Sequence, residues 1–140
     1  MEVKAPPPIR VLVVDDERDF ATAASERLTR RGFVAVPAFS GLQALAELAQ
    51  GGFDVVILDL RMPEMDGLET LRQIRGRDPH VQVVVLTGHG TVAAGIEGMC
   101  GGAADFLQKP AGIEELSAAV AAAAERARAS RAAEERGASQ

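Results

Sequence analysis

Four short apolar runs in the sequence each end in a residue whose side chain could interact with a phosphoryl group. These residues carry carboxylates, a hydroxyl and an ammonium group, and they are Asp15-Asp16, Asp59, Thr87 and Lys109. If the runs are parallel strands of one sheet, their carboxyl ends share an edge, which is where open α/β sheets bind their ligands. The spacing therefore predicts that these side chains meet in one crevice.

Taken singly, each of these residues has a structural explanation that involves no chemistry. Asp15-Asp16 could cap a helix and Asp59 could be a loop acid. Thr87 could be a hydroxyl at a strand end and Lys109 part of a surface turn. Their coincidence at one predicted edge, on different strands, favours a functional site over four unrelated structural roles.

Apolar runs alternate with segments of helical period five times, which is typical of repeated βα units and a parallel sheet. Strands are expected at residues 9–14, 33–36, 55–58, 81–86 and around 106–107. Helices are expected at 18–31, between Ser40 and Gly51, at 66–75, at 91–102 and from about 112 through 127. The sequence thus predicts an α/β fold with a five-stranded parallel sheet.

Two strands carry signals of their place in the sheet. Pro37 stands at the end of the second expected strand and cannot donate to a ladder, so this strand is expected at an edge. Residues 55–58 are apolar without alternation, which is typical of a central strand buried on both faces.

Length and composition predict one globular domain with a substantial core. The chain has 140 residues, of which 47% are hydrophobic and 25% charged, and a chain of this size folds without disulfide or metal staples. We expect a flexible segment at residues 1–8, the domain at 9–128, and a helical extension or a disordered tail at 129–140. The helix expected at 91–102 is rich in glycine and should be locally soft.

Charge and hydropathy argue against membrane and nucleic-acid partners. Residues 1–10 lack the apolar core of a secretory signal, and no apolar run approaches the length of a membrane span. The net charge is −5, and the arginines near the end of the chain are interleaved with glutamates, so they form no basic patch. We therefore expect a cytoplasmic protein that does not bind nucleic acid or a membrane directly.

Four sequence motifs resemble the signatures of the response-regulator receiver domains of two-component signalling, in the same order and spacing. They are VLVVDDE, VVILDLRMPEMDGLE, VVVLTGHG and DFLQKP, and the resemblance covers residues 9–127. The segments TGHG at 87–90 and ADFL at 104–107 are especially similar to receivers of the nitrogen-regulation and nitrogen-fixation types. The resemblance implies a doubly wound (βα)5 fold, flavodoxin-like, with strand order 2-1-3-4-5.

The resemblance also implies a magnesium site. Three carboxylates at one edge repel each other, and a hard divalent cation relieves that repulsion, so Mg²⁺ is the expected cofactor. By resemblance, Asp16 and Asp59 ligate the ion directly and Asp15 binds it through water. The backbone carbonyl of Arg61 completes the protein ligands.

A phosphoacceptor role follows from the same resemblance. Asp59 is implied as the nucleophile that takes a phosphoryl group from a phosphohistidine of a sensor histidine kinase or a phosphotransfer protein. Lys109 offsets the charge on the transferring oxygens, and Thr87 and Gly88 bind the phosphoryl group after transfer. Movement of Thr87 lets Phe106 turn inward, which reshapes the surface of the fourth helix, fifth strand and fifth helix. The chain is expected to be a signalling switch that catalyses only its own phosphorylation and dephosphorylation.

Two enzyme classes and one binding function are the alternatives. Residues 88–93 match the dinucleotide fingerprint G-x-G-x-x-A, but the acid that binds the ribose should follow the next strand. Asp105 stands at the start of that strand and Lys109 at its end. A phosphatase with an aspartate nucleophile needs a second acid two residues further on, where this sequence has Arg61. A receiver that signals by constitutive partner binding would not need the intact set of site residues.

The sequence leaves the output and the oligomeric state open. Too few residues follow the fifth helix for a DNA-binding or enzymatic output domain, so we expect output through protein contact or through a longer parent regulator. The fourth and fifth helices are a candidate surface for a phosphorylation-dependent homodimer. His80 and His89 are expected to be exposed loop histidines.

Overall fold

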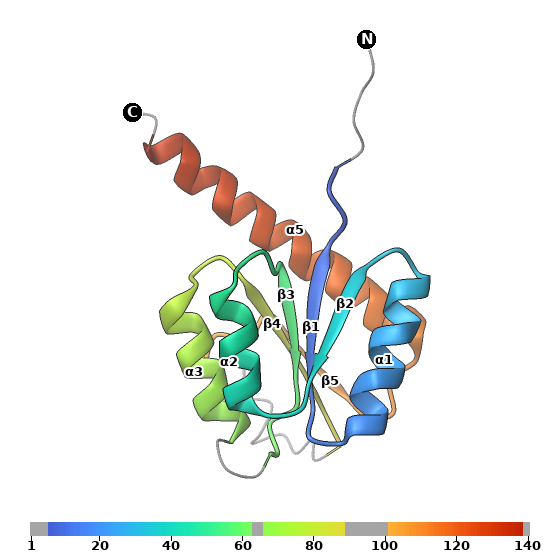
Figure 1. The fold of residues 1–140 in the computed structure, drawn as a ribbon. Helices are drawn as coiled ribbons and strands as arrows, with labels where there is room; N and C mark the ends of the chain where they lie inside the picture. Colours follow the sequence, from blue (N-terminus) through green and yellow to red (C-terminus); the bar gives the residue numbers. More distant parts are fainter. Residues whose placement is uncertain (1–5, 63–65, 89–100, 139–140) are drawn as a thin grey trace.

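The computed structural model describes residues 6–62, 66–88 and 101–138. Five strands form one parallel sheet in the order β2-β1-β3-β4-β5. Their bounds are Arg10–Val14 for β1, Val34–Ala38 for β2, Val55–Leu58 for β3, Gln82–Thr87 for β4 and Asp105–Gln108 for β5. The predicted flavodoxin-like strand order is confirmed (Figure 1).

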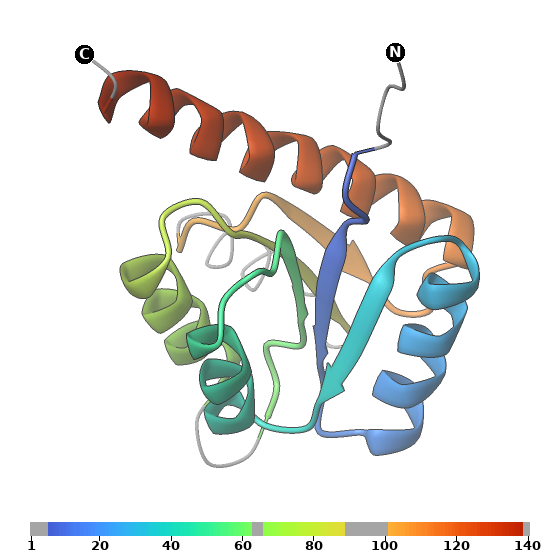
Figure 2. The same ribbon diagram turned by 45° about the horizontal axis from the view of Figure 1, so that its top comes forward.

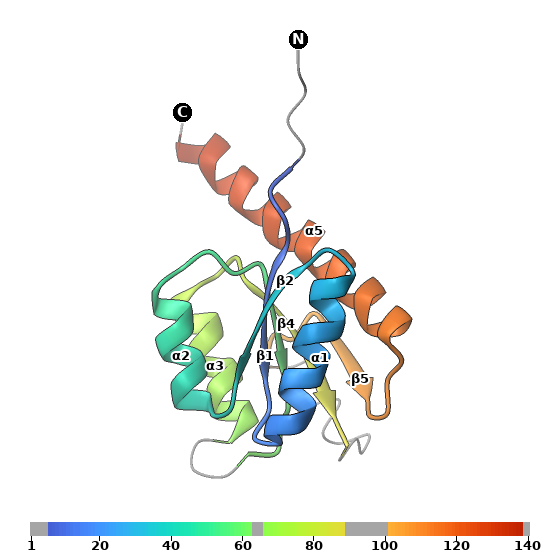
Figure 3. The same ribbon diagram turned by 45° about the vertical axis from the view of Figure 1, so that its right-hand side comes forward.

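Helices cover both faces of this sheet. Their bounds are Arg18–Arg30 for α1, Gly41–Ala49 for α2, Gly67–Arg77 for α3 and Ile113–Ala138 for α5. Helices α2 and α3 lie on one face, and α1 and α5 lie on the other (Figure 3). Within the described part of the chain, no helix combines the length and the apolar character needed to cross a membrane.

Three sequence expectations fall wholly or largely outside the described residues. The glycine-rich helix expected at 91–102 is one of them; its last two residues, which are described, form a turn. The others are most of the flexible segment expected at 1–8 and the exposed position expected for His89.

Alternation of side chains along the strands divides the core into two clusters. In β1, Val11 and Val13 pack toward α1 and α5, whereas Leu12 and Val14 pack toward α2 and α3. Successive strand residues point to opposite faces, and both faces are covered, so a central strand must be apolar throughout. This is why β3 is buried at every position, as the sequence predicted.

The helix starts are fixed by local side-chain caps. Ser40 Oγ accepts a hydrogen bond from the Gln43 N–H at 3.0 Å, which caps α2 as predicted. Asp66 caps α3 in the same way, since its carboxylate accepts from the Glu69 N–H at 2.8 Å. Such caps satisfy amide groups that have no partner within the helix.

Strand β2 lies at the edge of the sheet, as Pro37 indicated, but it does not end before this proline. It runs through Pro37 to Ala38, and Pro37 pairs with Val13 of β1. An edge strand has a neighbour on one side only, so a proline without an N–H can stand inside it. The predicted end of this strand at residue 36 is therefore wrong by two residues.

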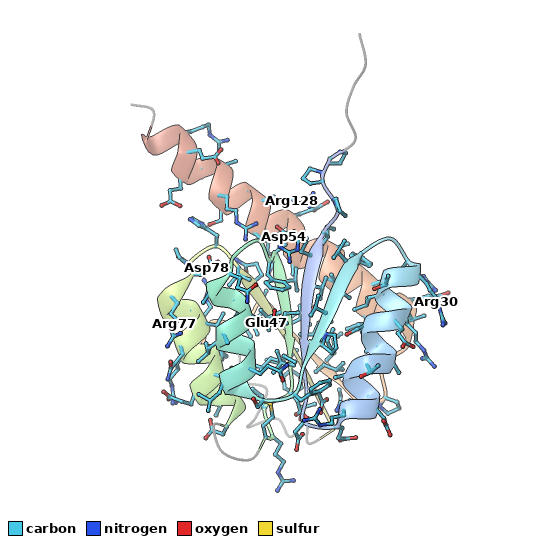
Figure 4. The ribbon with its side chains drawn as sticks, in the orientation of Figure 1. Arg30, Glu47, Asp54, Arg77, Asp78 and Arg128 are labelled. Atoms are coloured by element: carbon cyan, nitrogen blue, oxygen red, sulfur yellow. The ribbon has the colours of Figure 1, made fainter. Side chains whose placement is uncertain are left out.

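Helix α5 is 26 residues long, and its last turns extend past the end of the sheet at which the strands begin (Figure 2). Its arginines reach the buried carboxylate of Asp54, which directly precedes β3 (Figure 4). Arg131 Nη1 lies 2.5 Å from Asp54 Oδ1, and Arg128 Nη2 lies 3.5 Å from Asp54 Oδ2. The last turns of α5 are thus attached to the domain by charged groups.

His80 adds a second contact to this part of α5. Its Nδ1 lies 2.6 Å from Ser130 Oγ, and its Nε2 contacts the carboxylate of Glu134. The His80 side chain is 18% exposed. The expectation of an exposed loop histidine is therefore wrong at this position, because the extension of α5 covers the loop before β4.

Candidate functional site

Three of the residues singled out in the sequence meet in space at the carboxyl edge of the sheet. Asp15 follows β1, Asp59 follows β3 and Lys109 follows β5. Lys109 Nζ lies 2.5 Å from Asp15 Oδ2 and 3.6 Å from Asp59 Oδ2. Thr87 is the last residue of β4, which lies between β3 and β5. The structure thus brings Asp15, Asp59 and Lys109 together at one edge of the sheet.

Backbone amides orient the two buried carboxylates. The Glu17 N–H donates to Asp15 Oδ1 and the Arg61 N–H donates to Asp59 Oδ1, each at 3.0 Å. The second oxygen of each carboxylate faces Lys109. Asp15 does not cap α1, because the N-cap position is Glu17 and its side chain makes no cap hydrogen bond.

The electrostatics of the site follow from burial and from crowded charge. Burial raises the pKa of the Asp15 carboxyl above its ordinary value, against the opposing effect of the hydrogen bond from Lys109. Burial alone lowers the pKa of Lys109, but the hydrogen bond to Asp15 and the charges of Asp15, Asp59 and Glu17 outweigh it and raise that pKa. Lys109 is therefore a firmly protonated ammonium at neutral pH, set among carboxylates that repel one another.

Lys109 is also held by apolar and main-chain contacts. Its Nζ lies over the ring of Phe20, 4.1 Å from the centroid. Its backbone N–H donates to the Thr87 carbonyl at 2.9 Å. A Cβ on Gly88 would lie 3.9 Å from Lys109 Cδ, which is ordinary contact, so an alanine would fit there. The Lys109-Pro110 peptide bond is cis.

Carboxylates that could hold a cation gather at the same place. One carboxylate oxygen from each of Asp15, Glu17 and Asp59 lies within 4.8 Å of the others. Such a set of oxygen donors fits a hard divalent ion such as Mg²⁺. The resemblance named Asp16 as a direct ligand, and Asp16 is exposed and outside this group. Glu17 was missed by the sequence reasoning, although it is the third acid of the motif VLVVDDE.

The two proposed switch residues share one face of the sheet. Val85 of β4 pairs with Phe106 of β5, and Thr87 stands two residues beyond Val85. Residues two apart along a strand point to the same side, so Thr87 and Phe106 are diagonal neighbours. Thr87 is buried, and Phe106 is partly buried against the cluster under α2 and α3.

The start of α3 packs directly on the chain that carries Asp59. The Gly67 N–H donates to the Leu60 carbonyl at 3.0 Å. A Cβ on Gly67 would lie 2.2 Å from Leu60 Cα and 2.5 Å from the Asp59 carbonyl oxygen. These distances are too short for any side chain, so glycine is required here for a close approach of two backbones.

The dinucleotide alternative does not fit the order of residues along β5. Asp105 is the first residue of this strand and Lys109 follows its last residue. The position at which a ribose-binding acid should stand carries a cation instead. Residues 89–93 of the fingerprint lie outside the described residues.

Residues 11–121 match the family described as the response regulator receiver domain. The chain belongs to this family. Among curated proteins, it is 39% identical over 111 residues to the response regulator MprA of Mycobacterium sp. (strain KMS). The match covers 79% of this chain and 48% of MprA, so the chain spans about half the length of this relative.

Solved receiver structures have the same fold. A response regulator receiver domain protein from Clostridium thermocellum superposes with a TM-score of 0.81 at 34% identity, covering 86% of this chain and 97% of that one. The receiver domain of NtrX from Brucella abortus superposes with a TM-score of 0.78 at 32% identity, covering 82% of this chain and 98% of that one. The carboxyl edge described above is thus the corresponding edge of a receiver domain.

Proposed function

We propose that this receiver is a phosphoacceptor and that Asp59 is the residue phosphorylated. The observation that carries the proposal is the position of Asp59 at the sheet edge, where the residue is 4% exposed and its Oδ2 lies 3.6 Å from Lys109 Nζ. The phosphoryl donor is a phosphohistidine of a sensor histidine kinase or a phosphotransfer protein. A partner of this kind implies a cytoplasmic location.

The transfer is a substitution at phosphorus. An oxygen of Asp59 forms the new P–O bond while the P–N bond of the phosphohistidine breaks, and the departing imidazole keeps the electron pair. Lys109 offsets negative charge on the transferring oxygens. The Arg61 N–H holds the other Asp59 oxygen at 3.0 Å and thereby fixes the orientation of the carboxylate.

Mg²⁺ is proposed as the cofactor. Asp15, Asp16, Asp59 and the Arg61 carbonyl would hold it, and Glu17 is close enough to join them. When bound, the ion supplies positive charge that lowers the repulsion between the carboxylates and the incoming phosphoryl group. Lys109 alone cannot balance three carboxylates at neutral pH.

We propose that phosphorylation changes the surface formed by β5, α5 and the segment between β4 and β5. The acyl phosphate adds negative charge and acceptor oxygens, and the Thr87 hydroxyl and the Gly88 N–H bind it. Movement of Thr87 changes the packing around the Phe106 side chain, because the two residues are neighbours on one face of the sheet. The altered surface would control an output protein or domain or a homodimer.

The nitrogen-regulation or nitrogen-fixation subtype is part of the proposal. It is supported by the segments TGHG and ADFL, and the receiver domain of NtrX is among the similar structures. The subtype does not alter the chemistry proposed for Asp59.

Phosphorylation is tested by intact mass after incubation with Mg²⁺ and acetyl phosphate. We expect one labile phosphoryl adduct on the parent protein and none on Asp59→Asn. The matched control is Asp19→Asn, which removes an exposed carboxylate of α1 and should leave the adduct intact. Reduction of the acyl phosphate with borohydride and peptide mapping should locate it at Asp59. An undiminished adduct on Asp59→Asn would refute the proposal.

A further inference from the structure

The Lys109 ammonium must occupy two positions in turn during the proposed reaction. In the structure its Nζ is 2.5 Å from Asp15 and 3.6 Å from Asp59. To neutralise a group joined to Asp59, the ammonium must loosen its bond to Asp15 and turn toward Asp59. Something other than the carboxylates must therefore keep it in the site while its partners change.

Phe20 is placed to do this. It stands in the first turn of α1 and is partly buried against the cluster between α1 and α5. The Lys109 ammonium lies 4.1 Å from the centroid of its ring. The face of an aromatic ring carries negative partial charge and attracts a cation, and it does so without forming a directional bond that must be broken.

Among the described residues, Glu17 is a second side chain that could restrain the ammonium. Its Oε1 lies 3.8 Å from Lys109 Nζ, and its side chain is 71% exposed. Ion pairs at exposed positions are weak and are screened by salt. The Lys109 side chain is only 14% exposed, and the Phe20 ring that it contacts is partly buried. The Phe20 ring is therefore a stronger restraint on the ammonium than the Glu17 carboxylate.

We infer that Phe20 is a positioning residue for Lys109, holding the ammonium over its ring so that it can turn from Asp15 to a phosphoryl group on Asp59. The part of this inference that concerns the reaction rests on the function proposed above. The part that concerns the position of Lys109 does not. The two parts therefore have separate experiments.

The first experiment measures the position of Lys109 in the unphosphorylated protein. Ring current from Phe20 should shift the Lys109 Hε and Cε resonances upfield at a fixed pH. We expect Phe20→Leu to abolish this shift and Phe20→Tyr to retain it, because tyrosine keeps the ring face. Phe20 also lines a hollow together with Ala23, Ala111 and Leu116 among others.

The matched control is Phe39→Leu. Phe39 also carries a cation over its ring, since Arg18 Cζ lies 4.4 Å from the centroid, and it packs against the same core cluster as Phe20. Phe39→Leu should disturb the packing of this cluster about as much as Phe20→Leu does, but it should leave the Lys109 resonances unchanged. Unchanged Lys109 resonances in Phe20→Leu would overturn the inference.

The second experiment measures the rate of phosphorylation of Asp59 against acetyl phosphate concentration. We expect Phe20→Leu to lower the maximal rate by about two- to thirtyfold, the range that a cation–π contact corresponds to. Phe20→Tyr should restore the rate, and Phe39→Leu should not change it. Equal losses in Phe20→Leu and Phe39→Leu would assign Phe20 a purely structural role and overturn the inference.

A failure of the proposed function would be distinguishable from a failure of this inference. If the parent protein forms no adduct on Asp59, the phosphoacceptor proposal fails, while the resonances of Lys109 still test its contact with Phe20.

Discussion

At the residue scale, Lys109 decides the charge balance of the site. Its ammonium lies within 4.0 Å of carboxylate oxygens from Asp15, Glu17 and Asp59. Removing one carboxylate removes its repulsion with the other two, whereas removing the lysine leaves the negative charge of all three carboxylates uncompensated. Without a bound metal ion, the crowded carboxylates therefore repel one another at this edge, and binding of a cation there lowers the electrostatic energy.

Asp15→Asn should reveal this energy as a pH-dependent gain in stability. Burial raises the pKa of Asp15 above its ordinary value of 3.8, so this group stabilises the fold below that pH. The contribution is lost as the pH rises through the higher pKa of the folded state, because the folded protein there binds more protons than the unfolded chain. The variant does not titrate at this position. We expect its free energy of unfolding, relative to the parent, to increase as the pH rises above 3.8.

Urea unfolding at a series of pH values in buffer without Mg²⁺ measures this difference. Asp19→Asn is the control, because Asp19 is exposed on α1 and its removal relieves no burial. A difference between Asp15→Asn and the parent that is constant with pH would contradict the prediction.

At the element scale, the start of α3 determines where Asp59 lies. Gly67→Ala should displace the helix from the Leu60 backbone, because a Cβ at this position would overlap it. We expect a loss of about 1–3 kcal/mol in the free energy of unfolding, typical of overpacking. Slower phosphorylation by acetyl phosphate should accompany the loss.

Gly76→Ala is the matched control for this prediction. Gly76 lies in the same helix, and a Cβ there would meet nothing within 4 Å. Alanine has the higher helix propensity, so this variant should be as stable as the parent or more stable. Equal effects of the two substitutions would show that the close approach at Gly67 has no structural consequence.

The position of the last turns of α5, residues 128–138, depends on Asp54, which lies at the end of the sheet opposite to the site. Asp54→Asn should weaken the contacts of Arg128 and Arg131 with the domain. The expected cost is about 1–3 kcal/mol, the range for a hydrogen bond to a buried charged group. Amide hydrogen exchange at residues 128–138 should become faster, while exchange in β3 changes little. The Arg10 N–H at the start of β1 donates to Asp54 Oδ2 at 3.1 Å, so its exchange is expected to respond as well.

A double-variant cycle with Arg131→Met separates this contact from other effects. The two single losses should add to more than the loss in the double variant, because the residues contact each other. Arg136→Gln changes an exposed residue of the same helix and should leave the exchange rates as they are. Additive losses would show that the Asp54–Arg131 pair does not hold the extension.

At the scale of the whole molecule, the sheet links two ends with different roles. The carboxyl ends of the strands carry the site, and their amino ends carry the contacts with the last turns of α5. Helix α5 runs from one end to the other, since it begins soon after Lys109 and reaches Asp54 through Arg131. A displacement of β5 or α5 near the site is thereby connected to the position of the extension.

Much of the fold could be predicted from the sequence, because each strand and helix carries local signals. The period of the apolar residues identified the strands, Pro37 placed β2 at the edge and Ser40 marked the start of α2. The boundaries were less accurate. The end of β2 was predicted too early, since a proline on an edge strand leaves no ladder partner unmet.

The candidate site could be predicted only in part. The convergence of Asp15, Asp59, Thr87 and Lys109 on one edge follows from parallel strands and from where the apolar runs end. The proximity of Glu17 to Lys109, and the ring of Phe20 beneath the ammonium, do not follow. Both depend on how α1 is set against β5, and no local pattern encodes that distance.

The sequence alone determined the type and order of the elements, the strand ends at which reactive groups stand, and the family. Period and turn residues act over a few positions, so they can be read directly from the chain. Tertiary structure alone decided which oxygen of Asp15 meets Lys109, that His80 contacts the end of α5, and that Asp54 is buried under arginines. These contacts join residues 50 to 94 positions apart, and such distances are set by packing of the complete core.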